Sequence, residues 1–210
     1  MSAAITAKRV IYAGADALTL GRGVARVIDG ERIRLAPRWA RNYPNTYDPA
    51  KRMFLRAHCR PGTTVLDIGA HIGLYSVVMA RAVGEGGRVI SFEPTPGTRD
   101  ALRRTIGLNG LNGLVAVRAD AVTDRSGTVN FHDTADDLSN ANSVVAGPRS
   151  MRSYTVPATT VDDVVASVGD VPVSCLKIDV EGGEIGVLRG AAEALRRWRP
   201  AIALEVHPEV

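Results

Sequence analysis

The chain has 210 residues, 45% of them hydrophobic and 23% charged, which is ordinary for a single globular domain. Its formal charge of +4 comes almost wholly from scattered arginines, and aromatic residues make up only 5%, which argues against a nucleic-acid-binding track. A signal peptide and a membrane-spanning stretch are both lacking, and the distant Cys59 and Cys175 form no metal-type spacing, so we expect a cytoplasmic protein with free thiols and no membrane partner.

Residues 1–60 are predicted to form a β-rich cap or lid, because the segment is too short to fold alone. A hairpin turn is expected at Asp29-Gly30, and Arg60-Pro61-Gly62 ends the last element of the segment. The expected elements are strands at 10–12, 24–28 and 32–35 and a helix at 49–59.

Residues 61–210 are predicted to form the main domain, in which strands and helices alternate. Strands are expected at 65–68, 88–92, 114–118, 174–180 and 201–206. Helices are expected at 74–83, from 96 to the Asn109-Gly110 stop, from about 162, and at 184–198. Two antiparallel strands, 127–132 and 153–159, interrupt the pattern and flank a polar loop at 133–143. This order predicts an α/β fold with a mostly parallel sheet, helices on both faces and an inserted antiparallel hairpin.

The stretch 65–75 combines a buried strand, a tight turn and a helix start. Gly69 and Gly73 would let the backbone pass close to a ligand, and the new helix offers free N–H groups. The pattern therefore predicts a nucleotide cradle.

Ligands of such sheets bind at the carboxyl ends of the strands, and here an acidic residue follows each strand. Glu93, twenty residues past Gly73, is placed to bind ribose hydroxyls, which fits NAD as well as S-adenosylmethionine. The spacing of Gly69 and Gly73 differs from the dinucleotide motif, and a pyrophosphate would lie beside Asp67. A ligand carrying a cation near Asp67, such as S-adenosylmethionine, suits the cradle better.

Segment 65–75 resembles the first motif of class I S-adenosylmethionine-dependent methyltransferases, and the chain as a whole looks like the FkbM family. The match covers about residues 60–208, in the family's order. Its further pieces are Phe92-Glu93-Pro94, Asn109-Gly110-Leu111, 156–163, 176–183, 188–191 and 204–207.

This resemblance implies a three-layer Rossmann-like class I methyltransferase fold and O-methylation of a sugar, an oligosaccharide or a glycosylated natural product. It implies that Glu93 holds the ribose and that Asp120 and Ala121 border the adenine. The residues it assigns to the cofactor are Asp67, Gly69, Ala70, His71, Ile72, Gly73, Leu74, Tyr75, Glu93, Pro94, Asp120 and Ala121. His71 is expected to present only its backbone.

The acceptor chemistry is expected at the ends of the last two strands. His207 is the candidate general base, because the pKa of histidine lies near neutrality. Asp179, Glu181 and Glu205 complete the catalytic set, and Asp179, Glu205 and His207 are candidate ligands for Mg²⁺. Alternatively, Asp179 and Glu181 only orient Lys177 and the following helix.

Three other functions remain open: a nucleic-acid methyltransferase, a non-catalytic nucleotide-binding module and an NAD oxidoreductase. Motifs for methylating base amines or cytosine are not found, which disfavours the first. Class I enzymes usually add an antiparallel strand pair after the strand that ends in Glu205, whereas this sequence stops five residues later. We therefore expect the 127–159 hairpin, the N-terminal strands or a second copy in a homodimer to cover that sheet edge.

Overall fold

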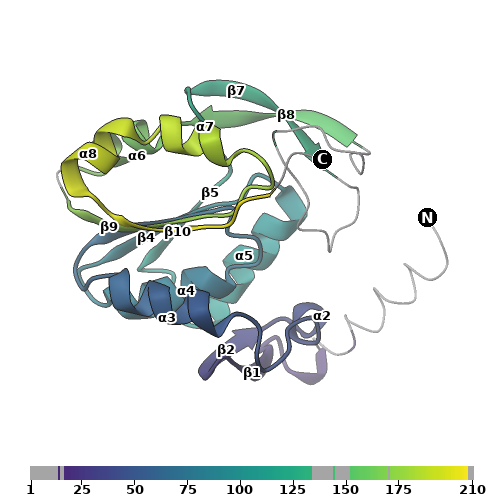
Figure 1. Cartoon of the computed structure of the whole chain (residues 1–210). Coiled ribbons are helices and arrows are strands. Elements are labelled where there is room, and N and C mark those ends of the chain that lie inside the picture. Colours follow the sequence, from purple (N-terminus) through teal and green to yellow (C-terminus); the bar gives the residue numbers. More distant parts are fainter. Residues whose placement is uncertain (1–13, 15–16, 134–143, 145–151, 170, 208–210) are drawn as a thin grey trace.

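The computed structural model describes residue 14 and residues 17–133, 144, 152–169 and 171–207. The strand predicted at 10–12 and nearly all of the predicted polar loop lie outside these ranges. The described part is a mixed α/β structure in layers, with helices on both faces of one central sheet (Figure 1).

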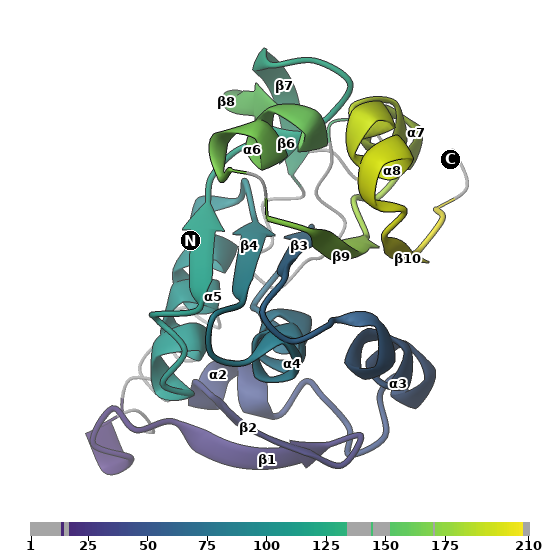
Figure 2. The same cartoon turned by 90° about the vertical axis from the view of Figure 1, so that its left-hand side faces the viewer.

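The central sheet has five parallel strands in the order β10-β9-β3-β4-β5 (Figure 2). Its strands are β3 Thr64–Ile68, β4 Arg88–Phe92, β5 Val115–Arg118, β9 Val173–Ile178 and β10 Ala201–Leu204. Every residue of β3 and β9 is buried, as expected for inner strands covered on both faces. The chain builds outward from β3 to β5 and then returns to the other side of β3 with β9. The order of strands therefore reverses between β3 and β9, where ligands of open α/β sheets bind.

Among the described residues, helices cover both faces of the sheet. One face carries α3 Pro49–His58, α4 Leu74–Val83 and α5 Pro96–Leu108, and the other carries α6 Val161–Ser167, α7 Glu184–Arg189 and α8 Ala192–Trp198 (Figure 2). The bounds predicted for α4 are confirmed, because Gly73 begins and Gly84 ends that helix.

The prediction of one helix over 184–198 was wrong, since the helix breaks between α7 and α8. A Cβ on Gly190 would lie 2.1 Å from the carbonyl oxygen of Thr123, so only glycine lets the two segments meet. The carbonyl of Gly190 also accepts the N–H of Asp162 at 3.0 Å instead of continuing the helix.

The predicted N-terminal hairpin is confirmed as β1 Val24–Ile28 paired antiparallel with β2 Glu31–Leu35. Its turn residues Asp29 and Gly30 have φ of +49° and +83°. A short helix that the sequence did not predict, α2 Pro37–Ala40, follows. Side chains from this segment, including Ile33, Leu35 and Trp39, belong to the same core as α4 and α5.

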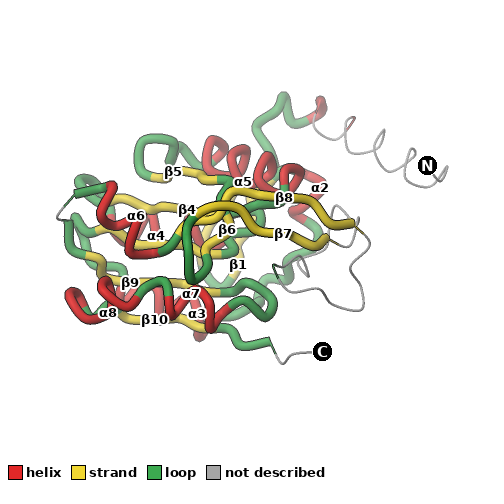
Figure 3. Tube along the Cα trace, turned by 90° about the horizontal axis from the view of Figure 1, so that it is seen from above, coloured by secondary structure: helices red, strands yellow, loops and turns green. Residues whose placement is uncertain are grey.

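The inserted hairpin is confirmed as β7 Gly127–Asp133 paired antiparallel with β8 Arg152–Thr159. A short strand that the sequence did not predict, β6 Ala121–Val122, pairs in parallel with β8, and the three strands form a separate sheet. Figure 3 looks onto the layer of α6, α7 and α8 and onto this hairpin beside it. Within the described ranges, neither this hairpin nor β1–β2 pairs with the edge strand β10, whereas the strand predicted at 10–12 lies outside those ranges. The homodimer stays a prediction.

The helices in the described ranges are all too short or too polar to cross a membrane. Cys59 and Cys175 are buried free thiols, as expected.

Candidate active site

A cavity enclosing about 900 Å³, part of it open to solvent, lies at the carboxyl ends of the central strands. Most of the predicted cofactor residues line it, namely Gly69, Ala70, His71, Ile72, Leu74, Tyr75, Glu93, Pro94, Asp120 and Ala121. Ile68, Phe92 and Val122, from β3, β4 and β6, also border the cavity.

Asp67 lies beneath this cavity and not in its wall, since it is fully buried. Its Oδ2 accepts a hydrogen bond of 2.6 Å from Ser76, and its Oδ1 lies 3.4 Å from Nζ of Lys177. Sequence reasoning treated Asp67 as an open anion facing the ligand, but Lys177 already compensates its charge. Nζ of Lys177 also donates to the carbonyl of Gly69 at 2.6 Å and lies 3.5 Å from Asp179. The sequence pattern did not indicate Lys177 as a site residue.

The two glycines of the turn make room for protein groups. Gly69 has φ of +77°, and a Cβ there would lie 1.8 Å from the carbonyl oxygen of Asp179. Gly73 has φ of +87°, and its Cβ would lie 2.4 Å from Leu102. The turn after β3 therefore touches the end of β9 directly, which joins the two halves of the site.

Glu93 is held in the cavity wall by two backbone N–H groups, those of His71 at 3.0 Å and Thr95 at 2.9 Å. Burial raises the pKa of the Glu93 carboxyl, although these hydrogen bonds oppose the shift. Asp120, at the end of the neighbouring strand, is oriented by Arg118 through contacts of 2.9 and 3.1 Å.

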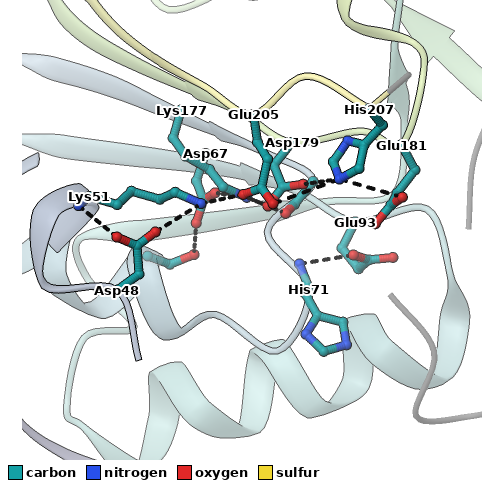
Figure 4. A network of polar contacts seen from close by, with 12 residues as sticks. Asp48, Lys51, Asp67, His71, Glu93, Lys177, Asp179, Glu181, Glu205 and His207 are labelled. Carbon is teal, nitrogen blue, oxygen red and sulfur yellow. Dashed lines mark hydrogen bonds and ion pairs between the residues drawn. The ribbon is translucent and has the colours of Figure 1, made fainter. Parts of the chain in front are cut away.

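The His71 imidazole points away from Glu93, so that only the His71 backbone faces that carboxylate (Figure 4). The ring packs edge-on against Trp39 at 5.4 Å, and its Nδ1 lies 3.3 Å from the Tyr43 hydroxyl. Burial, together with the charge of Lys177, lowers the pKa of His71 to about 4. The ring is therefore neutral at physiological pH.

The four predicted catalytic residues come together at the ends of β9 and β10 (Figure 4). Nε2 of His207 lies 4.0 Å from Asp179, 3.6 Å from Glu181 and 3.7 Å from Glu205. Asp179 also lines the cavity, so this group borders the cofactor residues.

Glu184 orients His207, and sequence reasoning missed it. Its Oε1 lies 3.2 Å from Nδ1 of His207 and accepts the N–H of Gly182 at 2.9 Å. Its side chain is 7% exposed, so it is a fixed partner. The signal in the sequence was an acidic residue in the first turn of a helix that follows two glycines. We call Asp179, Glu181, Glu184 and Glu205 the carboxylate cluster.

The carboxylate cluster acts on the protonation of His207. Burial lowers the pKa of His207, but the hydrogen bond to Glu184 and the charges of Glu181 and Asp179 outweigh it, and the pKa is raised. The pKa of Glu181 is raised as well, first by burial and then by Asp179, Glu205 and Glu184, against the opposing charge of His207.

Lysines hold the outer oxygens of two carboxylates in the cluster. Oε2 of Glu205 pairs with Lys51 of α3, which also lies 3.4 Å from Asp48, and Oδ2 of Asp179 pairs with Lys177. The remaining oxygens of Asp179 and Glu205 face Nε2 of His207. One ligand atom from each of these three residues lies within 4.8 Å of the others, which is the geometry of a candidate metal site.

Comparison with known proteins identifies the family. Residues 67–209 match the model described as the methyltransferase FkbM domain. The chain is 32% identical over 189 residues to the 31-O-demethyl-FK506 methyltransferase FkbM of Streptomyces tacrolimicus, covering 74% of this chain and 70% of that protein. The chain belongs to the FkbM family of S-adenosylmethionine-dependent methyltransferases.

A second relative is the hexuronic acid methyltransferase AglP of Haloferax volcanii, 30% identical over 69% of this chain and 56% of that protein. Among solved structures, the O-methyltransferase TomG from Streptomyces achromogenes superposes with a TM-score of 0.45 at 16% identity, over 77% of this chain and 57% of that one. A rRNA-methylase structure from Clostridium thermocellum gives a TM-score of 0.44 at 14% identity, over 69% and 58%. These superpositions are too loose to carry an argument about the substrate.

Proposed function

We propose that this FkbM-family chain transfers the methyl group of S-adenosylmethionine to a hydroxyl of a sugar or of a glycosylated small molecule. The observation that carries the proposal is one cavity that joins the Glu93 and Asp120 wall to Asp179, beside which His207 and the other carboxylates gather. One end suits a nucleoside and the other suits proton removal from a hydroxyl. The relative that acts on hexuronic acid supports a sugar acceptor.

The residues fit the cofactor as follows. Glu93, buried in the wall, accepts hydrogen bonds from the ribose, and Asp120 and Ala121 border the adenine. The turn 69–74 holds the methionine part. Asp67 contributes through Lys177, since its own carboxylate is buried.

The acceptor hydroxyl must lose its proton as its oxygen attacks the methyl carbon. We assign that proton to Nε2 of His207, because Glu184 holds Nδ1 and leaves Nε2 facing Asp179, which lines the cavity. Placing the hydroxyl ~3 Å from the methyl carbon is the second contribution of the site.

Asp179, Glu205 and His207 would also hold a divalent cation such as Mg²⁺, with Glu184 on the far nitrogen of His207 as an outer partner. When bound, such an ion lowers the pKa of a coordinated hydroxyl. Metal binding is the alternative to His207 as the general base, since a metal ion and a proton would use the same nitrogen of His207.

Two measurements test the proposal. S-adenosylhomocysteine should raise the melting temperature of the chain, whereas NAD should not. Incubation with S-adenosylmethionine and a panel of glycosides should release S-adenosylhomocysteine and a methyl ether. Stabilisation by NAD alone, or methylation of RNA in place of any glycoside, would contradict it.

A further inference from the structure

Tyr47 exposes an aromatic ring at the mouth of the cavity. Its side chain lines the cavity although the residue is 47% exposed. The ring of Tyr43, which lines the same wall, meets it edge-on at 5.0 Å. Tyr47 therefore offers an open, rigid apolar face to a molecule that enters beside the cofactor residues.

The position of Tyr47 is fixed from two sides. Asp29, in the β1–β2 turn, accepts the N–H of Tyr47 at 2.8 Å and that of Asp48 at 2.9 Å. Asp48 caps α3 by accepting the N–H of Lys51 at 2.9 Å, and the Lys51 side chain reaches Glu205 after β10. A ring held in this way loses little conformational freedom on binding.

The surroundings of the Tyr47 ring are polar on the cluster side. Asp179 lines the same cavity as Tyr47, and Glu205 pairs with Lys51, which also lies 3.4 Å from Asp48, the residue after Tyr47. An aromatic face flanked by hydrogen-bond acceptors matches a ring that has an apolar face and a hydroxyl rim.

A second observation points to a ligand at this end of the cavity. Tyr75 lines the cavity and is only 9% exposed, yet its hydroxyl has no hydrogen-bond partner among the residues that the structure describes. A buried hydroxyl without a partner is costly unless a ligand or water satisfies it. Nζ of Lys51, which pairs with Glu205, lies 5.2 Å from the centre of the Tyr75 ring, so Tyr75 lies at the same end of the cavity as the segment that carries Tyr47.

We propose that Tyr47 determines acceptor specificity by stacking against the C–H face of a neutral pyranose ring. The hydroxyls of that ring then reach the Tyr75 hydroxyl and the oxygens of Asp179 and Glu205. The carboxylate cluster with Asp48 and Asp67 outnumbers Lys51, Lys177 and His207, so the negative charge of a uronate or a phosphorylated sugar would be repelled. We therefore expect an uncharged acceptor ring here, in contrast to the hexuronic acid in the name of the relative AglP. The inference rests on the proposed function and names the substrate class of that same site.

The test uses the full chain saturated with S-adenosylhomocysteine and saturation-transfer NMR with methyl α-D-glucopyranoside, methyl α-D-mannopyranoside and methyl α-D-glucuronide. Ring protons of at least one neutral glycoside should be saturated in the wild type and in Tyr47→Phe. Tyr47→Ala should weaken that binding at least about tenfold. Met53→Ala, which changes a 63% exposed side chain of α3 that does not line the cavity, should behave as the wild type.

Two results would overturn the inference: glycosides that bind Tyr47→Ala as well as the wild type, or a glucuronide that binds as tightly as the neutral sugars. The inference would also be overturned if wild-type protein saturated with S-adenosylhomocysteine bound none of the glycosides. That result would not contradict the proposed cofactor. Failure of S-adenosylhomocysteine to bind the wild type would instead contradict the proposed function.

The role of Asp29 is tested by a double-mutant cycle. Asp29→Ala should weaken glycoside binding in the wild-type background, because Tyr47 loses its fixed position, and should have little further effect in Tyr47→Ala. An equal loss in both backgrounds would show that Asp29 does not act through Tyr47.

Discussion

Lys177 and Asp67 form a buried ion pair, with 3.4 Å between Nζ and Oδ1 and side-chain exposures of 3% and 0%. The pair lies directly under the cofactor turn, since the same Nζ donates to the carbonyl of Gly69. The Asp67 carboxylate thus finds its partners, Ser76 and Lys177, inside the protein.

Removing one partner of this pair should therefore damage the fold. We expect Lys177→Met to lower the free energy of unfolding by about 3–5 kcal/mol, because it leaves Asp67 charged and buried. The double variant Asp67→Asn/Lys177→Met should recover part of that loss in urea denaturation. A single variant as stable as the wild type would show that Asp67 has no need of its counter-ion.

Gly69 should be far more sensitive to substitution than Gly30, although both have positive φ. Gly30→Ala meets no atom within 4 Å and should cost only the left-handed conformational strain of about 1–2 kcal/mol. Gly69→Ala adds the clash with the Asp179 carbonyl, and overpacking of this kind costs about 1–3 kcal/mol more. Equal melting temperatures for the two variants would contradict the close approach of the turn to β9.

His207 should control kcat and not cofactor affinity. We expect His207→Gln to lower kcat by roughly 10²–10⁴-fold, the usual contribution of a positioned base. Glu184→Gln should lower kcat less while leaving the Kd of S-adenosylhomocysteine unchanged, since Glu184 acts through the orientation of His207. The control is Glu193→Gln, an exposed residue of α8 that pairs with Arg196. Wild-type kcat in His207→Gln would rule out its role as base.

Chelation separates the two ways of activating the hydroxyl. If a divalent cation binds between Asp179, Glu205 and His207, excess EDTA should abolish activity, and Mg²⁺ should restore it and raise the melting temperature. Asp179→Asn should remove that thermal shift. Activity that is unchanged by EDTA would reject the metal and leave His207 as the base.

His71 should make the fold sensitive to acid. Its pKa of about 4 lies below the ordinary value of 6.5, so the unfolded chain binds a proton at this residue more readily than the folded chain. The contribution of neutral His71 to the free energy of unfolding is at most roughly 3 kcal/mol. It is fully present above pH 6.5 and is lost as the pH falls towards 4. His71→Gln should flatten the dependence of unfolding free energy on pH over this window.

Local patterns in the sequence were enough to predict most of the fold. Alternating apolar runs and glycine stops gave the positions of the five central strands, and Gly73 and Gly84 predicted both ends of α4, because strand burial and helix termination depend on neighbouring residues. The break at Gly190 escaped prediction, since its cause is the carbonyl of Thr123, far away in the chain.

The same distinction holds for the site. The sequence by itself determined the family, the cradle at 65–75 and the gathering of Asp179, Glu181, Glu205 and His207, because residues that follow parallel strands meet at one edge of the sheet. Only the tertiary structure decided that Asp67 is paired with Lys177, that Glu184 holds His207 and that Tyr47 stands at the mouth of the cavity. These relationships join segments brought together by folding, and their charges and distances depend on packing that no local pattern encodes.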